Sequence, residues 1–277
     1  MNKYLFVTLF FFLFSTHSYA GQPYDLVTTG DHSVWVIVND VKDRFTKDTG
    51  ITLDLLPELA IVGKGCGKGI LHARRGSPDR DFGLICCTLD NTVLANNGVK
   101  VYTVAHEPLA IIVNRKNPVS NLTLQQLRDI FSGKTTNWKD VGGRNEKIAV
   151  ITQLHCPDYT PNWKGILGDS AAFTKKRVDV KAQPEMAKTV SDFGQAIGHL
   201  EMTSVKESKD PVKILALDGY LPTSENMQKG LYPLFAPLAV ATKGDAEGKV
   251  IKFIEYMRTS PEAAEAMKKY GMAQTAK

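Results

Sequence analysis

The chain has few cysteines, no dense block of basic residues and, after its first twenty residues, no long apolar run. Four Cys in 277 residues exclude a disulfide-dense miniprotein, and 22 Gly with 13 Pro exclude a collagen-like repeat. A hydrophobic content of 43% excludes a disordered chain. No later segment approaches the roughly 20 apolar residues that a membrane-spanning helix needs. The sequence therefore indicates a globular protein of one large domain or two small ones.

The charge balance is mildly basic, with 34 Lys and Arg against 29 Asp and Glu and a formal net charge of +5. Because no segment concentrates that charge, it favours attraction of small anions over binding of nucleic acid. We therefore expect no nucleic-acid partner.

Residues 1–20 have the pattern of a cleaved secretory signal. Lys3 precedes an apolar run from Tyr4 to Phe14, and the small residues Ser18 and Ala20 occupy the two positions that a signal peptidase inspects. No Cys stands at the cleavage point, so we expect no lipid attachment there. The sequence predicts a periplasmic or secreted protein after signal removal.

The first half of the mature chain alternates predicted strands and helices. Strands are predicted at 25–29, 51–56 and 82–87, and an apolar stripe from Val34 to Phe45 predicts a helix that ends at Gly50.

A glycine-containing turn leads into a helix N-terminus twice, near Ser33 and near Gly67, so two positive helix ends could face one anion. The second turn is not a nucleotide-binding P-loop, because only three residues separate Gly63 from Gly67 and Gly69 replaces the Ser or Thr.

The second half continues the pattern, which is α/β throughout. Thr123 and Gln126 form a capping-box arrangement before a helix that Gly133 ends. A further helix is expected to start at Pro184 and to run through Met186, Val190, Phe193 and Ile197, and a last one to start at Ser260 and end near Gly271. Strands are expected at 109–114, 148–154, 212–217 and 238–242.

The four Cys stand at positions 66, 86, 87 and 156. In a secreted protein they are normally read as two disulfides, for which three connectivities exist. Cys86 and Cys87 are adjacent, however, and none of the four lies in the C-terminal third, which is not typical of a framework that staples a whole fold.

A long run of motifs resembles the phosphate-binding proteins of phosphate ABC transporters. The run comprises EPLAIIVN at 107–114, NPVSNLT at 117–123, LRDIFSGK at 127–134 and NWKDVGG at 137–143. Later segments agree with it: GQAIG at 194–198 looks like the glycine-rich turn of that family, and LDGYLPT at 217–223 with GLYPL at 230–234 looks like its return crossover.

This resemblance implies a type II periplasmic binding-protein fold, in which two crossovers join two α/β lobes around a ligand cleft. Lobe I would comprise residues 21–104 and 236–277, and lobe II residues 105–235. The family implies a small-ligand carrier and not an enzyme, monomeric and without a cofactor, that serves an ABC transporter permease or a membrane sensor.

The ligand loops depart from the family pattern, in which hydroxyl groups, backbone amides, acidic side chains and an arginine surround phosphate. The first loop, TTGDHSV at 28–34, is similar to it, whereas the others read GCGKGI at 65–70, ICCT at 85–88 and TQLHCPDYT at 152–160, without the arginine or the Ser-Gly-Thr turn. The ligand-binding residues implied by this alignment are Thr29, Gly30, Asp31, His32, Ser33, Cys66, Gly67, Cys86, Cys87, Thr88, His155 and Cys156.

All four Cys then map to loops around one cleft. Loss of the arginine lowers the expected affinity for phosphate, whereas thiolates favour Cu(I), zinc or a trivalent species such as arsenite. The predicted ligands of such a species are Cys66, Cys87, His155 and Cys156. Because Cys66 lies at a helix N-terminus, we expect its thiol to have a lowered pKa.

Three questions stay open: the nature of the ligand, the state of Cys66 and the class of function. The ligand is either an oxyanion or a thiophilic metal or metalloid species, and Cys66 is either a ligand or half of a disulfide with Cys86, Cys87 or Cys156. A thiol-based redox protein or enzyme using Cys86, Cys87 or Cys156 is the other function class, although the chain has no Cys-x-x-Cys pair.

Overall fold

A computed structural model describes residues 24–57, 65–156 and 159–275. The predicted signal, residues 1–20, lies outside these ranges, and so do Gly63 and Lys64 of the second glycine turn. None of the helices within the described ranges is long and apolar enough to span a membrane.

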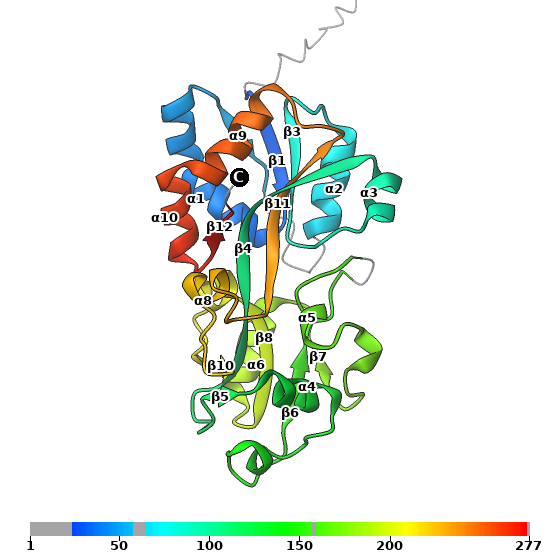
Figure 1. The fold of residues 1–277 in the computed structure, drawn as a ribbon, viewed down its shortest axis with the longest axis vertical. Helices are drawn as coiled ribbons and strands as arrows, with labels where there is room; N and C mark the ends of the chain where they lie inside the picture. Colours follow the sequence, from blue (N-terminus) through cyan, green and yellow to red (C-terminus); the bar gives the residue numbers. More distant parts are fainter. Residues whose placement is uncertain (1–23, 58–64, 157–158, 276–277) are drawn as a thin grey trace, which may run out of the picture.

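Two α/β lobes follow one another along the long axis of the molecule (Figure 1). One large hydrophobic cluster, built from residues within 26–105 and 238–272, fills the first. Two clusters from residues within 109–234 and 110–202 fill the second. The fold is the expected type II periplasmic binding-protein fold, and the lobe boundaries given above stay a prediction.

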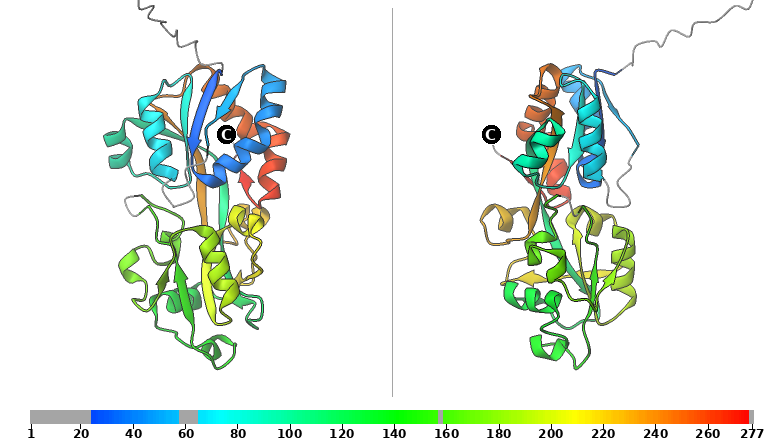
Figure 2. Two further views of the ribbon diagram at one scale, coloured as in Figure 1. Left: turned by 180° about the vertical axis from the view of Figure 1, so that it is seen from behind. Right: turned by 90° about the vertical axis from the view of Figure 1, so that its right-hand side faces the viewer.

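Two antiparallel strands, β4 (Val99–Asn114) and β11 (Phe235–Lys243), pass from one lobe to the other (Figures 1 and 2). Strand β4 pairs with β11 up to Pro108 and with β8 (Ala196–Glu201) from Leu109 onward. The strand predicted at 109–114 is thus only the last part of β4, because polar residues such as Glu107 interrupt the apolar pattern before it.

In lobe I, β1 pairs in parallel with β2 and β3, and β11 adds to β3 antiparallel. Helices α1 and α10 flank this sheet on one side and α2 and α3 on the other (Figure 1). The remaining lobe I elements are β1 (Leu26–Gly30), α1 (His32–Thr49), β2 (Leu53–Leu55), α2 (Gly65–Arg75), β3 (Asp81–Ile85), α3 (Asn91–Asn97), α9 (Gly248–Thr259), α10 (Pro261–Lys269) and β12 (Ala273–Gln274).

In lobe II, β6 and β8 are parallel, and β8 and β9 pair antiparallel with β4. The other elements are β5 (Asn121–Leu122), α4 (Leu124–Ser132), η1 (Trp138–Val141), β6 (Ala149–Thr152), α5 (Lys164–Leu167), η2 (Ser170–Ala172), β7 (Val178–Asp179), α6 (Gln183–Asp192), α7 (Met202–Glu207), β9 (Val212–Ile214), β10 (Ala216–Leu217) and α8 (Ser224–Gln228).

The caps predicted from the sequence are confirmed for α1, α4 and α10. Gly50 ends α1 in the left-handed conformation, with φ 71°. Thr123 Oγ1 accepts from the Gln126 N–H at 3.1 Å, and Gln126 Oε1 accepts from the Thr123 N–H at 2.8 Å. Ser260 caps α10, which ends at Lys269.

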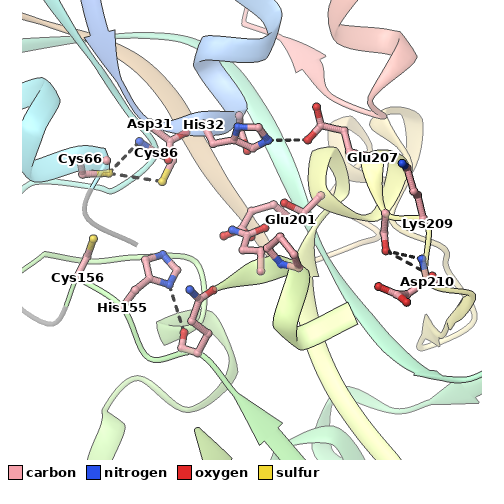
Figure 3. A pocket seen from close by; sticks show the side chains of 17 residues that line it. Asp31, His32, Cys66, Cys86, His155, Cys156, Glu201, Glu207, Lys209 and Asp210 are labelled. Carbon is pink, nitrogen blue, oxygen red and sulfur yellow. Dashed lines mark hydrogen bonds and ion pairs between the residues drawn. The ribbon is translucent and has the colours of Figure 1, made fainter. Parts of the chain in front are cut away.

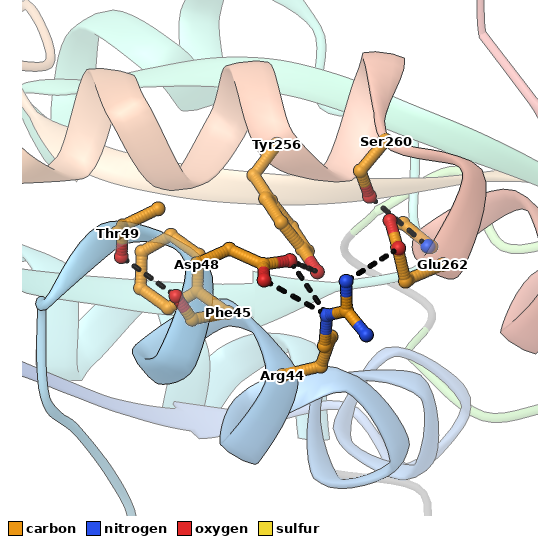
Figure 4. Close-up of polar contacts among 8 residues, drawn as sticks. Arg44, Phe45, Asp48, Thr49, Tyr256, Ser260 and Glu262 are labelled. Carbon is orange, nitrogen blue, oxygen red and sulfur yellow. Dashed lines mark hydrogen bonds and ion pairs between the residues drawn. The ribbon is translucent and has the colours of Figure 1, made fainter.

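Polar contacts tie the C-terminal helices to α1 (Figure 4). Arg44 Nε donates to Asp48 at 2.8 Å, and another nitrogen of the same guanidinium lies 3.3 Å from Glu262 of α10. Tyr256 of α9 donates its hydroxyl to Asp48 at 3.3 Å. The C-terminal helices therefore pack on the lobe that contains the N-terminal strand.

The helix expected from Pro184 to Ile197 is too long. Helix α6 ends at Asp192, Phe193 is exposed, and Ile197 lies on β8. The apolar spacing continues the helical period, but hydrogen bonds to β4 and β6 hold these residues as a strand. Likewise, Gly198 of the expected glycine-rich turn lies within β8.

Candidate functional site

A cavity of 350 Å³ lies between the lobes, where residues from both contribute (Figure 3). It opens at the carboxyl ends of the parallel strands β1, β3, β6 and β8, the edge at which α/β sheets bind ligands. Its lining consists of Asp31, His32, Ser33, Gly65, Cys66, Cys86, Gln153, His155, Cys156, Gln183, Pro184, Glu201, Ser204, Glu207, Ser208, Lys209 and Asp210.

The N-terminus of α1, expected to face an anion, already carries a carboxylate of the protein. Asp31 caps α1 by accepting a hydrogen bond from the Val34 N–H at 3.3 Å. The Asp31 N–H donates to the Leu84 carbonyl of β3 at 2.9 Å, which fixes the position of the cap. Because a helix N-terminus favours one negative charge, Asp31 competes with any external anion there.

The structure brings the four thiols together, and three of them, Cys66, Cys86 and Cys156, line the cavity. Cys66 is the second residue of α2, Cys86 and Cys87 directly follow β3, and Cys156 lies on the segment after β6. Cys66 Sγ lies 2.9 Å from Cys87 Sγ and 3.5 Å from Cys86 Sγ, and all four cysteines are thiols. The Sγ atoms of Cys66, Cys87 and Cys156 all lie within 4.8 Å of one another, and we call this set the thiol triad.

The expected lowering of the Cys66 pKa is wrong. Cys66 is 1% exposed, and burial is the largest influence on its thiol and raises its pKa. Contacts with the neighbouring sulfur atoms, together with burial, place the pKa of Cys87 well above its ordinary value. The contact with Cys66 raises the pKa of Cys156 to about 11. The triad therefore consists of neutral thiols at neutral pH.

Two further carboxyl groups, those of Glu107 and Glu201, are buried, and Glu201 lines the cavity. Glu107 Oε1 accepts from the backbone N–H of Thr203 at 2.8 Å and from its hydroxyl at 2.6 Å, and Glu201 Oε1 accepts from Asn162 at 2.6 Å. Burial, followed by the nearby Glu201, raises the pKa of Glu107 to about 7. Burial also raises the pKa of Asp31, with a further contribution from Cys66.

Within the described residues, these three carboxyl groups have no cationic partner. Among the ion pairs of the described residues, none includes Asp31, Glu107 or Glu201. No arginine is found among the described residues that line the cavity, and Lys209 is the single lysine there. The site is therefore acidic, in contrast to the mildly basic chain as a whole.

Two histidines line the cavity in different roles. His32 Nε2 lies 2.5 Å from Glu207 Oε2, a contact between lobe I and lobe II. His155 Nδ1 lies 3.2 Å from the Gln153 carbonyl, and the His155 carbonyl accepts from the Trp163 indole at 2.8 Å. His155, a predicted ligand of a thiophilic species, belongs to neither of the close donor sets found in the described ranges, which are the thiol triad and the set Asp31, Cys66 and Cys86.

Five of the twelve predicted ligand residues lie outside the cavity lining described above. Thr29 and Gly30 are buried on β1, and Gly67 lies inside α2. Cys87 is buried beneath Cys66, and Thr88 is exposed and forms a two-way backbone bridge with Thr160 of lobe II, both bonds 3.0 Å long. The other seven, Asp31, His32, Ser33, Cys66, Cys86, His155 and Cys156, line the cavity.

The predictions from the sequence omit most of the lobe II residues that line the cavity. Glu201 ends β8, Glu207 ends α7, and Asp210 follows shortly after. The helix predicted from the sequence extends to Ile197, so β8 is missed, and no helix is predicted at 202–207. The run AIGHL at 196–200, followed by Glu201, is the available sign of a buried strand that ends at the cleft.

Comparisons with known proteins agree with this architecture. A family model described as a PBP superfamily domain matches residues 17–262. The phosphate-binding protein PstS of Bacillus subtilis is 30% identical over 167 residues, 57% of this chain and 52% of that protein. PstS of Borreliella burgdorferi is 27% identical over 172 residues, 59% of this chain and 62% of that protein. The chain thus spans about half the length of the curated relatives it matches.

Solved structures show the same fold. A Clostridium perfringens protein described as a phosphate ABC transporter substrate-binding protein, solved with bound phosphate, superposes with a TM-score of 0.73 at 22% identity, covering 90% of this chain and 99% of that one. An ABC-type phosphate transport receptor from Vibrio cholerae has a TM-score of 0.67 at 26% identity, covering 90% and 100%. The chain belongs to the PBP superfamily, and within it the chain is similar to phosphate-binding proteins.

Proposed function

We propose that this protein is an extracytoplasmic solute-binding protein that captures a small thiophilic species between its lobes and presents it to an ABC transporter permease or a membrane sensor. The observation that carries the proposal is the thiol triad, which combines Cys66 and Cys87 of lobe I with Cys156 of lobe II at the interlobe cavity. Three sulfur donors from both sides of a cleft are a soft-ligand site in the position where a solute is held.

The acidic lining supports a ligand other than phosphate. Asp31, Glu201, Glu207 and Asp210 face the cavity, and a phosphate anion placed there would be repelled by each that is ionised. The lining offers one flexible ammonium group, on Lys209, in place of a guanidinium fork that grips phosphate with two hydrogen bonds.

Contacts across the cleft support capture by lobe closure. The contact of His32 with Glu207 and the backbone bridge of Thr88 with Thr160 each join lobe I to lobe II. A ligand that bonds to the thiols of both lobes would add to these contacts and stabilise the closed arrangement. The protein as proposed performs no catalysis and needs no cofactor of its own.

A ligand screen by thermal unfolding tests the proposal. Reduced protein is heated with phosphate, sulfate, arsenite, zinc or Cu(I), in a reductant that is not a thiol. A ligand at 100 times its Kd adds about 2.7 kcal/mol to the free energy of unfolding. We expect stabilisation by a thiophilic species and none by phosphate.

A Cys156→Ser variant is the matched control, since it removes one thiol from the cleft and keeps a small polar side chain. The thiophilic species should lose its effect on this variant. Stabilisation by micromolar phosphate, equal in both proteins, would overturn the thiol assignment. Failure to detect thiols after denaturation without reductant would favour the disulfide alternative.

A further inference from the structure

The thiol triad offers one sulfur from each of three separate segments. Cys66 begins α2, Cys87 follows β3 and Cys156 follows β6, so no two of the donors are chain neighbours. The fourth thiol, Cys86, belongs to a different set, with Asp31 and Cys66. The donor set is therefore three sulfur atoms around one point, which matches a centre that forms three bonds.

The surroundings restrict the charge of the bound centre. The carboxyl group of Asp31 lies within 4.8 Å of the thiols of Cys66 and Cys86, and Glu201 lines the same cavity. Glu201 is 5% exposed, and neither acid takes part in an ion pair within the described residues. Three thiolates together carry three negative charges. The complex with a univalent ion therefore has a net charge of −2, and the complex with a divalent ion has a net charge of −1. Burying a net negative charge beside carboxyl groups is energetically costly, whereas the complex of a trivalent centre with three thiolates has no net charge.

The free ligand must also enter an acidic cavity. Arsenite is an uncharged trihydroxide in water near neutral pH, so the carboxylates at Glu201, Glu207 and Asp210 do not repel it as they would repel phosphate. The cavity of 350 Å³ has room for such a molecule.

We propose that Cys66, Cys87 and Cys156 bind a trivalent metalloid hydroxide of the arsenite class as a trithiolate that joins the two lobes. This inference rests on the proposed function and narrows its ligand. Each sulfur forms a bond to the metalloid, each metalloid to oxygen bond breaks, and each thiol proton leaves with a hydroxide as water. Three waters are released, and neither the sulfur nor the metalloid changes oxidation state.

The first test uses the reduced wild-type protein and one equivalent of arsenite. Native mass spectrometry should show a gain of one arsenic less three hydrogens, and X-ray absorption at the arsenic edge should show three sulfur neighbours and no oxygen. An adduct that keeps an arsenic to oxygen bond, or no adduct at all, overturns the proposal.

The second test assigns the donors. Cys66→Ser, Cys87→Ser and Cys156→Ser should each lower arsenite affinity by at least about 100-fold, because loss of even a supporting contact to a ligand atom costs 10- to 100-fold. The Cys86→Ser adduct should keep three sulfur neighbours. A loss of one sulfur neighbour in that variant would show that Cys86 is a donor and would overturn the assignment.

Other ligands separate this inference from the proposed function. If Cu(I) or zinc binds through the triad and arsenite leaves no adduct, the metalloid inference fails and the proposed function stands. If phosphate alone binds, both fail.

Discussion

At the scale of single residues, the buried carboxyl of Glu107 makes the stability of the fold depend on pH. Its pKa lies at about 7 in the folded protein, against roughly 4.3 in an unfolded chain. A raised pKa in an acid means that the folded state holds the proton more tightly. Glu107 therefore stabilises the fold fully at pH values below the unfolded pKa, and that contribution is lost as the pH rises toward 7.

A Glu107→Gln variant tests this effect. The amide is neutral at every pH and can still accept from Thr203, so the variant should lose the decline between about pH 4.5 and 7. At pH 8 it should be more stable than the wild type, by up to about 3 kcal/mol. Urea unfolding across this pH range measures the difference. Glu265→Gln, on an exposed site, is the matched control, and equal curves for all three proteins would contradict the assigned pKa.

At the scale of elements, the capping box of α4 makes a separable contribution. Thr123→Ala removes the hydroxyl that accepts from the Gln126 N–H, which should cost about 1 kcal/mol of the free energy of unfolding. Gln125→Ala removes an exposed contact to Asp129 on the same helix and should cost no more than about 0.5 kcal/mol. Chemical denaturation of the two variants checks the order, and a larger loss for Gln125→Ala would count against the capping box.

The same elements show how far the sequence predicts the fold. Helices α1 and α4 follow from local signals, an apolar stripe and a cap at each end, which need no information from the rest of the chain. Strand β8 does not, because residues 186–197 keep a helical apolar period and only pairing with β4 and β6 decides otherwise.

The candidate site, like the fold, is only partly predictable from the sequence. The convergence of Cys66, Cys87 and Cys156 could be predicted from a family alignment of elements, since it depends on topology. The acidity of the cavity could not, because Glu201, Glu207 and Asp210 resemble any other acid in the sequence until the fold is known. The raised pKa of Cys66 has the same origin.

At the scale of the whole molecule, closure depends on groups that join the lobes. The pair of His32 with Glu207 is partly exposed, with 28% and 40% of the side chains accessible, and such pairs contribute at most about 1 kcal/mol. Glu207→Ala should therefore weaken arsenite binding by no more than about fivefold.

Titration of both proteins with arsenite measures the difference. Glu225→Ala, which breaks the exposed pair with Lys229 away from the cavity lining, is the control and should leave affinity unchanged. If Glu207→Ala lowers arsenite affinity 100-fold or more, Glu207 contacts the ligand directly and does more than join the lobes through His32.

The change of partner along β4 has a mechanical consequence. Both crossover strands carry proline at the interlobe level, where Phe235 of β11 stands opposite Pro108 and Pro237 opposite His106. Proline has no N–H to donate, so neither Pro108 nor Pro237 can donate to the ladder between the two strands. Each proline therefore removes one possible backbone hydrogen bond from the stretch of chain that joins the lobes. A motion of one lobe against the other that bends the strands at this level would break no hydrogen bond donated by either proline.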